Sequence, residues 1–271
     1  MSCDALEVRQ TTTGYSCTCT GRLSVSDPEC ALNKSSTRLR SQERAKTFFH
    51  PLWRTQLPLL RMITFAVLVP VSVLFLALPL QQLVPMSELL RDPNATVYDA
   101  QNRVMFYRGT ISNVGILLWW AAASVYAFAA YLYRPRSGIP AFSPPRVFLG
   151  YMAVLTGLLA LDDLFMIHEE LLPVRLGIPE VSMYVLYGVL VVGLAMFVRV
   201  LLNTDFLVLG LALGFFAFSM VTDMGLLHAL VSLPDGAFLL VEDLTKMLGI
   251  VCWFVFSLRT SARLLRRDAS T

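Results

Sequence analysis

Acidic and histidine side chains gather at three places in the sequence, each at the edge of a long apolar stretch. These segments are LDDLFMIHEE at 161–170, TDMGLLH at 222–228 and VEDLTK at 241–246. Charged side chains inside a membrane helix are costly, so each of them is a candidate functional residue. Carboxylates and imidazoles are also groups that bind zinc and iron in proteins. The residue types therefore predict either a metal centre or a set of groups that bind protons or cations.

Two of these segments share a spacing. Asp163 and His168 are five residues apart, and so are Asp223 and His228. The two pairs are 60 residues apart and each ends an apolar stretch, which suggests a duplicated two-helix unit. Five residues rise about 7.5 Å along an α-helix and turn it by about 140°. The Asp and His of one pair therefore cannot bind one ion from a rigid helix, and the ligands have to come from different helices.

The charged residues receive three predicted roles. Six are predicted metal ligands for zinc or iron: Asp163, His168, Asp223, His228, Glu242 and Asp243. Asp162 and Glu169 are the predicted catalytic carboxylates, either of which would act as general base. Lys246 is the predicted counter-charge, because it follows Asp243 by three residues and Glu242 by four and can pair with either on one helix face.

The deepest of these groups carry a large formal charge. Five acids stand against one base, Lys246, which leaves −4 if all of them ionise: Asp162, Asp163, Asp223, Glu242 and Asp243. In a low dielectric, either some carboxyl groups hold protons or a cation lies among them. Structural roles stay open for each group: histidines that cap helix ends, hydrogen-bonded aspartates and an intramembrane salt bridge. Aromatic residues, Trp119 and Trp120 among them, are predicted to be packing residues and interface anchors.

Composition places the chain in a membrane. Of its 271 residues, 56% are hydrophobic and 15% are charged, and the mean hydropathy is +0.62. Soluble domains carry about 25% charged residues. A membrane-spanning helix takes about 20 residues, and six apolar stretches are long enough: 62–80, 110–132, 147–172, 181–202, 206–230 and 237–258. The predicted fold is an all-α, polytopic membrane bundle of six transmembrane helices.

Lys and Arg are distributed unevenly between the two sides of this bundle. With the N-terminus inside, twelve lie in inner segments and four in outer loops, so both termini are predicted to be cytoplasmic. Three regions follow: a tail predicted to be disordered at 1–55, the transmembrane domain at 56–260 and a short basic tail at 261–271. The first region has no apolar block of the kind found in a signal peptide. Four of the five cysteines lie there, and we expect free thiols.

Four functions fit this pattern. The first is a metal-dependent membrane hydrolase or oxidase that acts on a lipid or another small apolar substrate. The second is a proton- or cation-coupled transporter, which the absence of charge in the inner halves of the helices disfavours. The third is haem ligation by His168 and His228, and the fourth is a structural protein whose polar groups lock helices together. No basic run is dense enough for nucleic acid, so the expected partner is membrane lipid, and short loops favour a bacterial inner membrane.

Overall fold

The computed structural model describes residues 8–11, 14–17, 56–80, 84, 86–90, 107, 109–133, 143–179, 181–225 and 234–269. The chain divides into two units, Met1–Thr55 and Gln56–Thr271. In the first unit, strands β1 (Val8–Thr11) and β2 (Gly14–Cys17) pair antiparallel, with Val8 opposite Cys17. The rest of the predicted N-terminal tail, Cys3, Cys19 and Cys30 included, lies outside the described residues. Its disorder stays a prediction.

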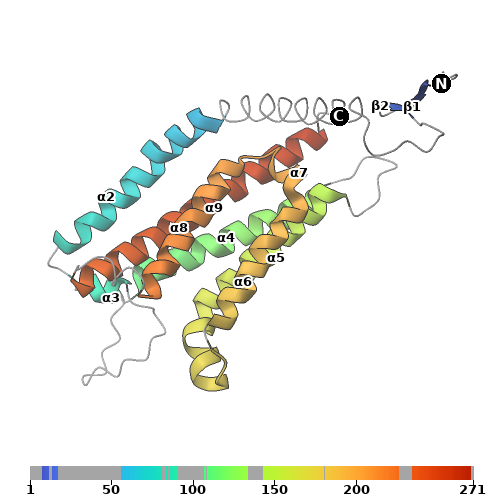
Figure 1. Cartoon of the computed structure of the whole chain (residues 1–271). Helices are drawn as coiled ribbons and strands as arrows, with labels where there is room; N and C mark the ends of the chain where they lie inside the picture. Colours follow the sequence, from blue (N-terminus) through green and yellow to red (C-terminus); the bar gives the residue numbers. More distant parts are fainter. Residues whose placement is uncertain are drawn as a thin grey trace, which may run out of the picture. The chain divides into compact units, whose positions relative to one another are not determined.

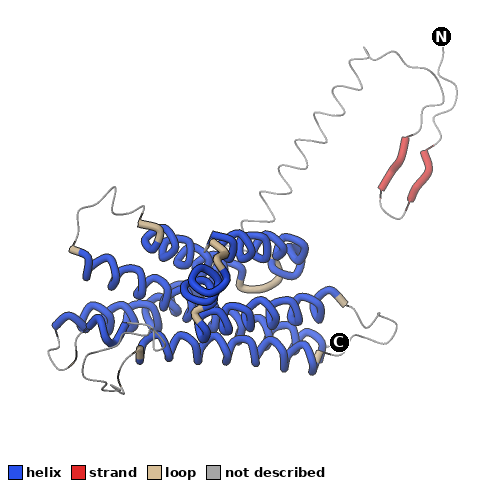
Figure 2. The backbone as a smooth tube through the Cα atoms, turned by 90° about the horizontal axis from the view of Figure 1, so that it is seen from below, coloured by secondary structure: helices blue, strands red, loops and turns tan. Residues whose placement is uncertain are grey.

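Every described element of the second unit is a helix (Figure 1, Figure 2). It opens with the helical stretch Gln56–Leu80, which contains the π-helical turn η1 (Thr64–Leu68), α2 (Val69–Ala77) and the 3-10 turn η2 (Leu78–Leu80). The other helices are α3 (Met86–Leu90), α4 (Thr110–Leu132), α5 (Pro144–Phe165), η3 (Ile167–Leu176), α6 (Val181–Gly193), η4 (Leu194–Phe197), α7 (Val198–Leu201), α8 (Phe206–Asp223) and α9 (Asp235–Ala269). The predicted all-α architecture is confirmed for this unit.

Within the described residues, five helices are long and apolar enough to cross a membrane: Gln56–Leu80, Thr110–Leu132, Pro144–Phe165, Val181–Leu201 and Phe206–Asp223. They overlap the first five apolar stretches of the sequence. The predicted sixth span, 237–258, lies inside α9, which is not among these five and which carries Glu242, Asp243 and Lys246. The protein therefore has several membrane-type helices, while a count of six spans and the cytoplasmic placement of the termini stay predictions.

Small and aromatic residues hold the helices together. α4 lies between α5 and α9, and α8 packs along α9 (Figure 1). Ala122 and Ala129 of α4 are buried, and small side chains of this kind let helix backbones approach closely. At Gly249 of α9, an added Cβ atom would lie 2.5 Å from Cε1 of Phe216 on α8. That position therefore accepts a larger residue only if the Phe216 ring moves.

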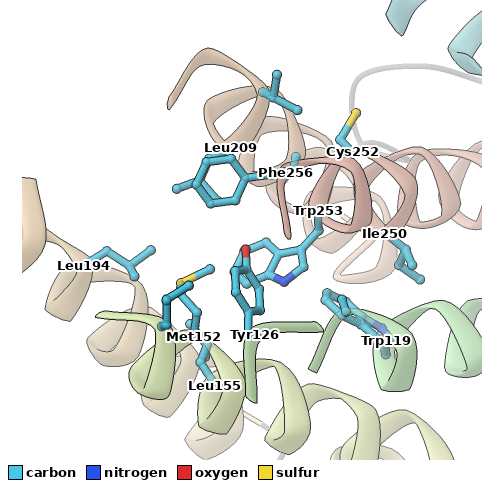
Figure 3. Packing of buried hydrophobic residues seen from close by; sticks show 14 of the residues in the cluster. Trp119, Tyr126, Met152, Leu155, Leu194, Leu209, Ile250, Cys252, Trp253 and Phe256 are labelled. Atoms are coloured by element: carbon cyan, nitrogen blue, oxygen red, sulfur yellow. The ribbon is translucent and has the colours of Figure 1, made fainter. Parts of the chain in front are cut away.

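Two polar groups lie within the aromatic core, and only one of them has a partner in the described part of the chain. Figure 3 shows Trp253 and Tyr126 among the buried apolar side chains. Trp253 Nε1 donates a hydrogen bond of 3.0 Å to the hydroxyl of Thr156 on α5, and both residues are buried. The hydroxyl of Tyr126 is also buried and has no hydrogen-bond partner among the described residues. The Trp253–Thr156 bond therefore connects α9 to α5 across the core.

A buried ion-pair cluster holds the N-terminal end of α8, the end opposite Asp223. Asp205 directly precedes α8 and is only 2% exposed. Its Oδ2 accepts a hydrogen bond from Arg259 Nε, and its Oδ1 pairs with Arg263 Nη2, each at 2.8 Å. The side chain of Gln56 hydrogen-bonds backbone atoms on both sides of Asp205. These contacts join the first helical stretch, the start of α8 and the second half of α9.

The two polar groups of the core give a matched test of this packing. We expect Thr156→Val to lower the free energy of unfolding by about 1–3 kcal/mol, because it leaves the buried Trp253 N–H without its acceptor. Tyr126→Phe should change it by less than about 0.5 kcal/mol or raise it, because no described group bonds the lost hydroxyl. Reversible unfolding in mixed detergent micelles measures both values. Equal losses in the two variants would contradict the assignment.

Candidate functional site

The turn after α5 brings Asp162 to His168. α5 ends at Phe165, before the predicted end near residue 172, because Met166 adopts a left-handed conformation with φ 49°. Met166 is the one non-glycine residue with positive φ in the described part of the chain, and this conformation costs an L-residue about 1–2 kcal/mol. Asp162 offsets that cost. Its Oδ1 accepts the His168 backbone N–H at 3.0 Å, and its Oδ2 lies 2.7 Å from His168 Nδ1.

This contact gives the buried Asp162 carboxylate two partners. Asp162 is 3% exposed, and a buried carboxylate requires hydrogen bonds or a counter-charge. In a straight helix, residues six apart point to different sides, so the left-handed turn at Met166 is what makes the contact geometrically attainable. Asp162 therefore holds the imidazole of His168, whereas the predicted catalytic role would require it to reach a substrate.

Asp163 connects three helices. Its Oδ2 accepts a hydrogen bond of 2.9 Å from Trp119 Nε1 on α4, and its Oδ1 lies 3.2 Å from Lys246 Nζ on α9. Lys246 was predicted to pair with acids of its own helix, and the structure adds this partner from α5. Both carboxylate oxygens of Asp163 are used, as expected of a charge in a low-dielectric environment. Asp163 therefore ties α4, α5 and α9 together.

α6 presents one face to this region, and its Leu190 carbonyl accepts a hydrogen bond from the Tyr151 hydroxyl of α5. Tyr184, Tyr187, Gly188 and Val191 line the same cavity at spacings of three, four and seven residues, which places them on one helix face. The Tyr184 hydroxyl donates a hydrogen bond of 2.8 Å to Asp223 Oδ2 at the end of α8. None of the described residues of α6 is buried. Hydrogen bonds and the packing of this face therefore attach α6 to its neighbours.

Two cavities adjoin at the charged residues. The larger, about 530 Å³, lies between α4, α5, α6, α8 and α9 and has aromatic walls: Trp119, Tyr184, Tyr187, Phe216 and Trp253. The smaller, about 400 Å³, is bounded by α3, α4 and α9 and by the ends of α5 and α8. Four ionisable side chains line both cavities: Asp163, Asp223, Glu242 and Lys246. These four therefore lie at the boundary between an aromatic chamber and a smaller, more polar one.

Most of the predicted site residues line one of the two cavities, but they are distributed between them. Asp243 lines the smaller cavity and His168 the larger one. His228 and the side chain of Glu169 lie outside the described residues. The duplicated two-helix unit and haem ligation by His168 and His228 therefore stay predictions. Within the described ranges, no three His, Cys, Asp or Glu side chains are close enough together to hold one metal ion. The predicted metal centre stays a prediction.

Aromatic partners of the carboxylates were not predicted from the sequence. Trp119 was expected to be a packing residue or an interface anchor, yet its indole N–H bonds Asp163. The Tyr184 hydroxyl bonds Asp223 in the same way. The signal available in the sequence was the helical spacing of Tyr184, Tyr187, Gly188 and Val191, which places two tyrosines and a glycine on one helix face.

The family of this chain is defined by a sequence model. A model described as Domain of unknown function (DUF8692) matches residues 62–260. The chain belongs to this family. All residues that line the two cavities lie inside the matched range of the DUF8692 domain. No curated protein and no solved structure matches the chain.

The Asp162–His168 turn can be tested by replacing the carboxylate. We expect Asp162→Leu to lower the free energy of unfolding by about 2 kcal/mol, because the His168 N–H loses its acceptor beside a strained residue. Asp162→Asn keeps an oxygen for that N–H and should lose about half as much. Denaturant unfolding in detergent measures both, with the exposed Glu170→Gln as a control. If the Leu variant is as stable as the unsubstituted protein, the turn does not depend on Asp162.

Proposed function

We propose that this protein binds a small amphipathic molecule, such as a membrane lipid or a comparably sized substrate, in its larger cavity. The observation that carries the proposal is a cavity of about 530 Å³ with aromatic walls and charged residues along one boundary. Ligand sites commonly measure about 300–1,000 Å³ and combine apolar walls with a few polar groups. The cavity has both properties, and four of the helices around it, α4, α5, α6 and α8, are of membrane type.

The lining residues divide the cavity into an apolar part and a polar part. Leu155, Leu159, Val191 and Leu213 contribute apolar surface, while Asp163, Asp223, Glu242 and Lys246 lie at the boundary with the smaller cavity. An acyl chain or ring system would bury against the first set, and a polar group would meet the second. Burial of apolar ligand surface contributes about 25 cal/mol per Å², so the aromatic walls supply affinity and the charged boundary supplies orientation.

The cavity also reaches the protein surface. Gly188 of α6 and Ala217 of α8 both line it and are both exposed. In a bilayer, this opening between α6 and α8 would face lipid. A molecule that resides in the membrane could therefore enter sideways, without crossing the water phase.

Filling the cavity should abolish binding. A side chain added at Gly188 meets no atom within 4 Å, so Gly188→Leu places its bulk in the cavity without a clash at Cβ. Gly210→Leu is the matched control, because Gly210 is equally open and exposed but does not line the cavity. To restrict the fluorescence signal to the cavity, both variants also carry Trp53→Phe and Trp120→Phe. The two tryptophans that remain, Trp119 and Trp253, line the cavity.

In that background, a brominated long-chain alcohol should quench tryptophan emission in a saturable manner. We expect the Gly188→Leu variant to weaken this binding at least about tenfold and the Gly210→Leu control to leave it unchanged, because one leucine side chain occupies the ligand volume and the other does not. Quenching titrations in maltoside micelles measure the difference. Equal quenching in both variants would show that the alcohol binds elsewhere.

A metal-dependent reaction on the bound molecule is the second candidate. The smaller cavity is lined by four carboxylates and by the counter-charge Lys246. The carboxylates are those of Asp163, Asp223, Glu242 and Asp243. Oxygen ligands of this kind suit divalent cations, and a bound metal would supply a Lewis acid or an activated water beside the amphipathic molecule. This candidate retains the predicted hydrolase or oxidase activity.

Elemental analysis of the detergent-purified protein tests that candidate. A metal enzyme should contain about one zinc or iron per chain, and Asp223→Asn combined with Glu242→Gln should lower that content at least about tenfold, because two anionic carboxylate ligands become neutral amides. Glu170→Gln, outside both cavities, should leave it unchanged. Metal-free protein purified without chelators would contradict the metal-dependent reaction and leave the binding proposal in place.

A further inference from the structure

We propose that the larger cavity selects amphipathic molecules whose polar end is an organic cation, either an amine or a quaternary ammonium group. This inference rests on the proposed binding function and adds the charge of the ligand. It follows from three features of the cavity: its formal charge, the partners of its lysine and the placement of Asp223.

The ionisable groups that line the cavity carry an excess of negative charge. Among the described residues, Asp163, Asp223 and Glu242 contribute three carboxylates and Lys246 one ammonium, so their formal charge is −2 with His168 neutral. Protonation of His168 would leave −1. A cationic ligand reduces this excess and an anionic ligand increases it, and the difference is larger in a water-poor cavity than in water. Charge complementarity therefore favours a cation.

Lys246 is the group that an anionic ligand would need, and it is already engaged. Its Nζ lies 3.2 Å from Asp163 Oδ1, and the other oxygen of that carboxylate is held by Trp119. An anion could reach Lys246 only beside Asp163, Asp223 and Glu242, where like-charge repulsion opposes it. An anionic ligand would therefore have to compete with the Asp163 carboxylate for Lys246.

Asp223 is the carboxylate best placed to meet a cationic end group. It lies at the end of α8, is exposed and lines both cavities. Tyr184 holds its Oδ2, and within the described ranges its Oδ1 accepts no hydrogen bond. Tyr184 and Tyr187 also line this cavity, and tyrosine rings attract organic cations that lie within about 6 Å of the ring centre. A carboxylate next to aromatic rings is a combination that recognises ammonium groups.

Three amphiphiles that differ only in their head groups test the charge preference. Each compound is titrated as a competitor that displaces the brominated alcohol and so relieves the quenching of Trp119 and Trp253. The three competitors are dodecyltrimethylammonium, dodecanol and dodecyl sulfate. The Gly188→Leu variant reports non-specific partition into the micelle and is subtracted. We expect the trimethylammonium compound to bind about tenfold more tightly than the alcohol and the sulfate to bind more weakly than the alcohol.

Two charge variants assign the residues. Asp223→Asn should lower the preference for the cation over the alcohol about tenfold, because the carboxylate that faces the cationic end becomes a neutral amide. Glu242→Gln provides an independent second removal of negative charge and should lower that preference in the same direction. Lys246→Gln makes the cavity more negative, so the preference for the cation should persist or rise.

The outcomes separate the two proposals. If the alcohol competes but the cation gains nothing over it, the charge selectivity is wrong and the binding function stands. If the sulfate binds most tightly and Lys246→Gln abolishes its binding, the cavity selects anions and the inference is overturned. If none of the three compounds competes and the brominated alcohol itself does not bind, the proposed function fails along with the inference.

Discussion

The carboxylate of Asp163 is the contact on which the polar end of the protein depends. It receives the indole N–H of Trp119 from α4 and the ammonium of Lys246 from α9, so three helices meet at one side chain. A charge among apolar helices is stable only with partners of this kind, because water is not there to solvate it. The same contact fixes the Trp119 ring as a wall of the larger cavity. The contacts of Asp163 therefore both join three helices and hold one wall of the larger cavity in place.

A second constraint is the end of α5. The left-handed turn at Met166 stops the helix and returns the chain, so that His168 meets Asp162 on the buried side. Met166 is itself buried and lines the smaller cavity, which explains a bulky residue where glycine is usual. The turn thus pairs Asp162 with His168, while neighbouring Asp163 stays at the cavity boundary.

The two ends of α8 treat their acids differently. At its start, Asp205 is buried and pairs with Arg259 and Arg263, so both oxygens have a cationic partner. At its other end, Asp223 is exposed and holds only the Tyr184 hydroxyl in the described part of the chain. The first arrangement satisfies a buried charge and is structural. The second leaves carboxylate capacity next to aromatic rings, which is the arrangement expected of a binding site.

The sequence by itself determined the helical class and the approximate bounds of five membrane-type helices, because hydropathy and helix length follow directly from residue order. It also identified Asp163, Asp223, Glu242 and Lys246, the four side chains that line both cavities. Only the tertiary structure decided the partners: Lys246 with Asp163, His168 with Asp162, and Tyr184 with Asp223. Partners depend on how helices rotate against one another and on a single left-handed residue. Neither leaves a periodic signal along the chain.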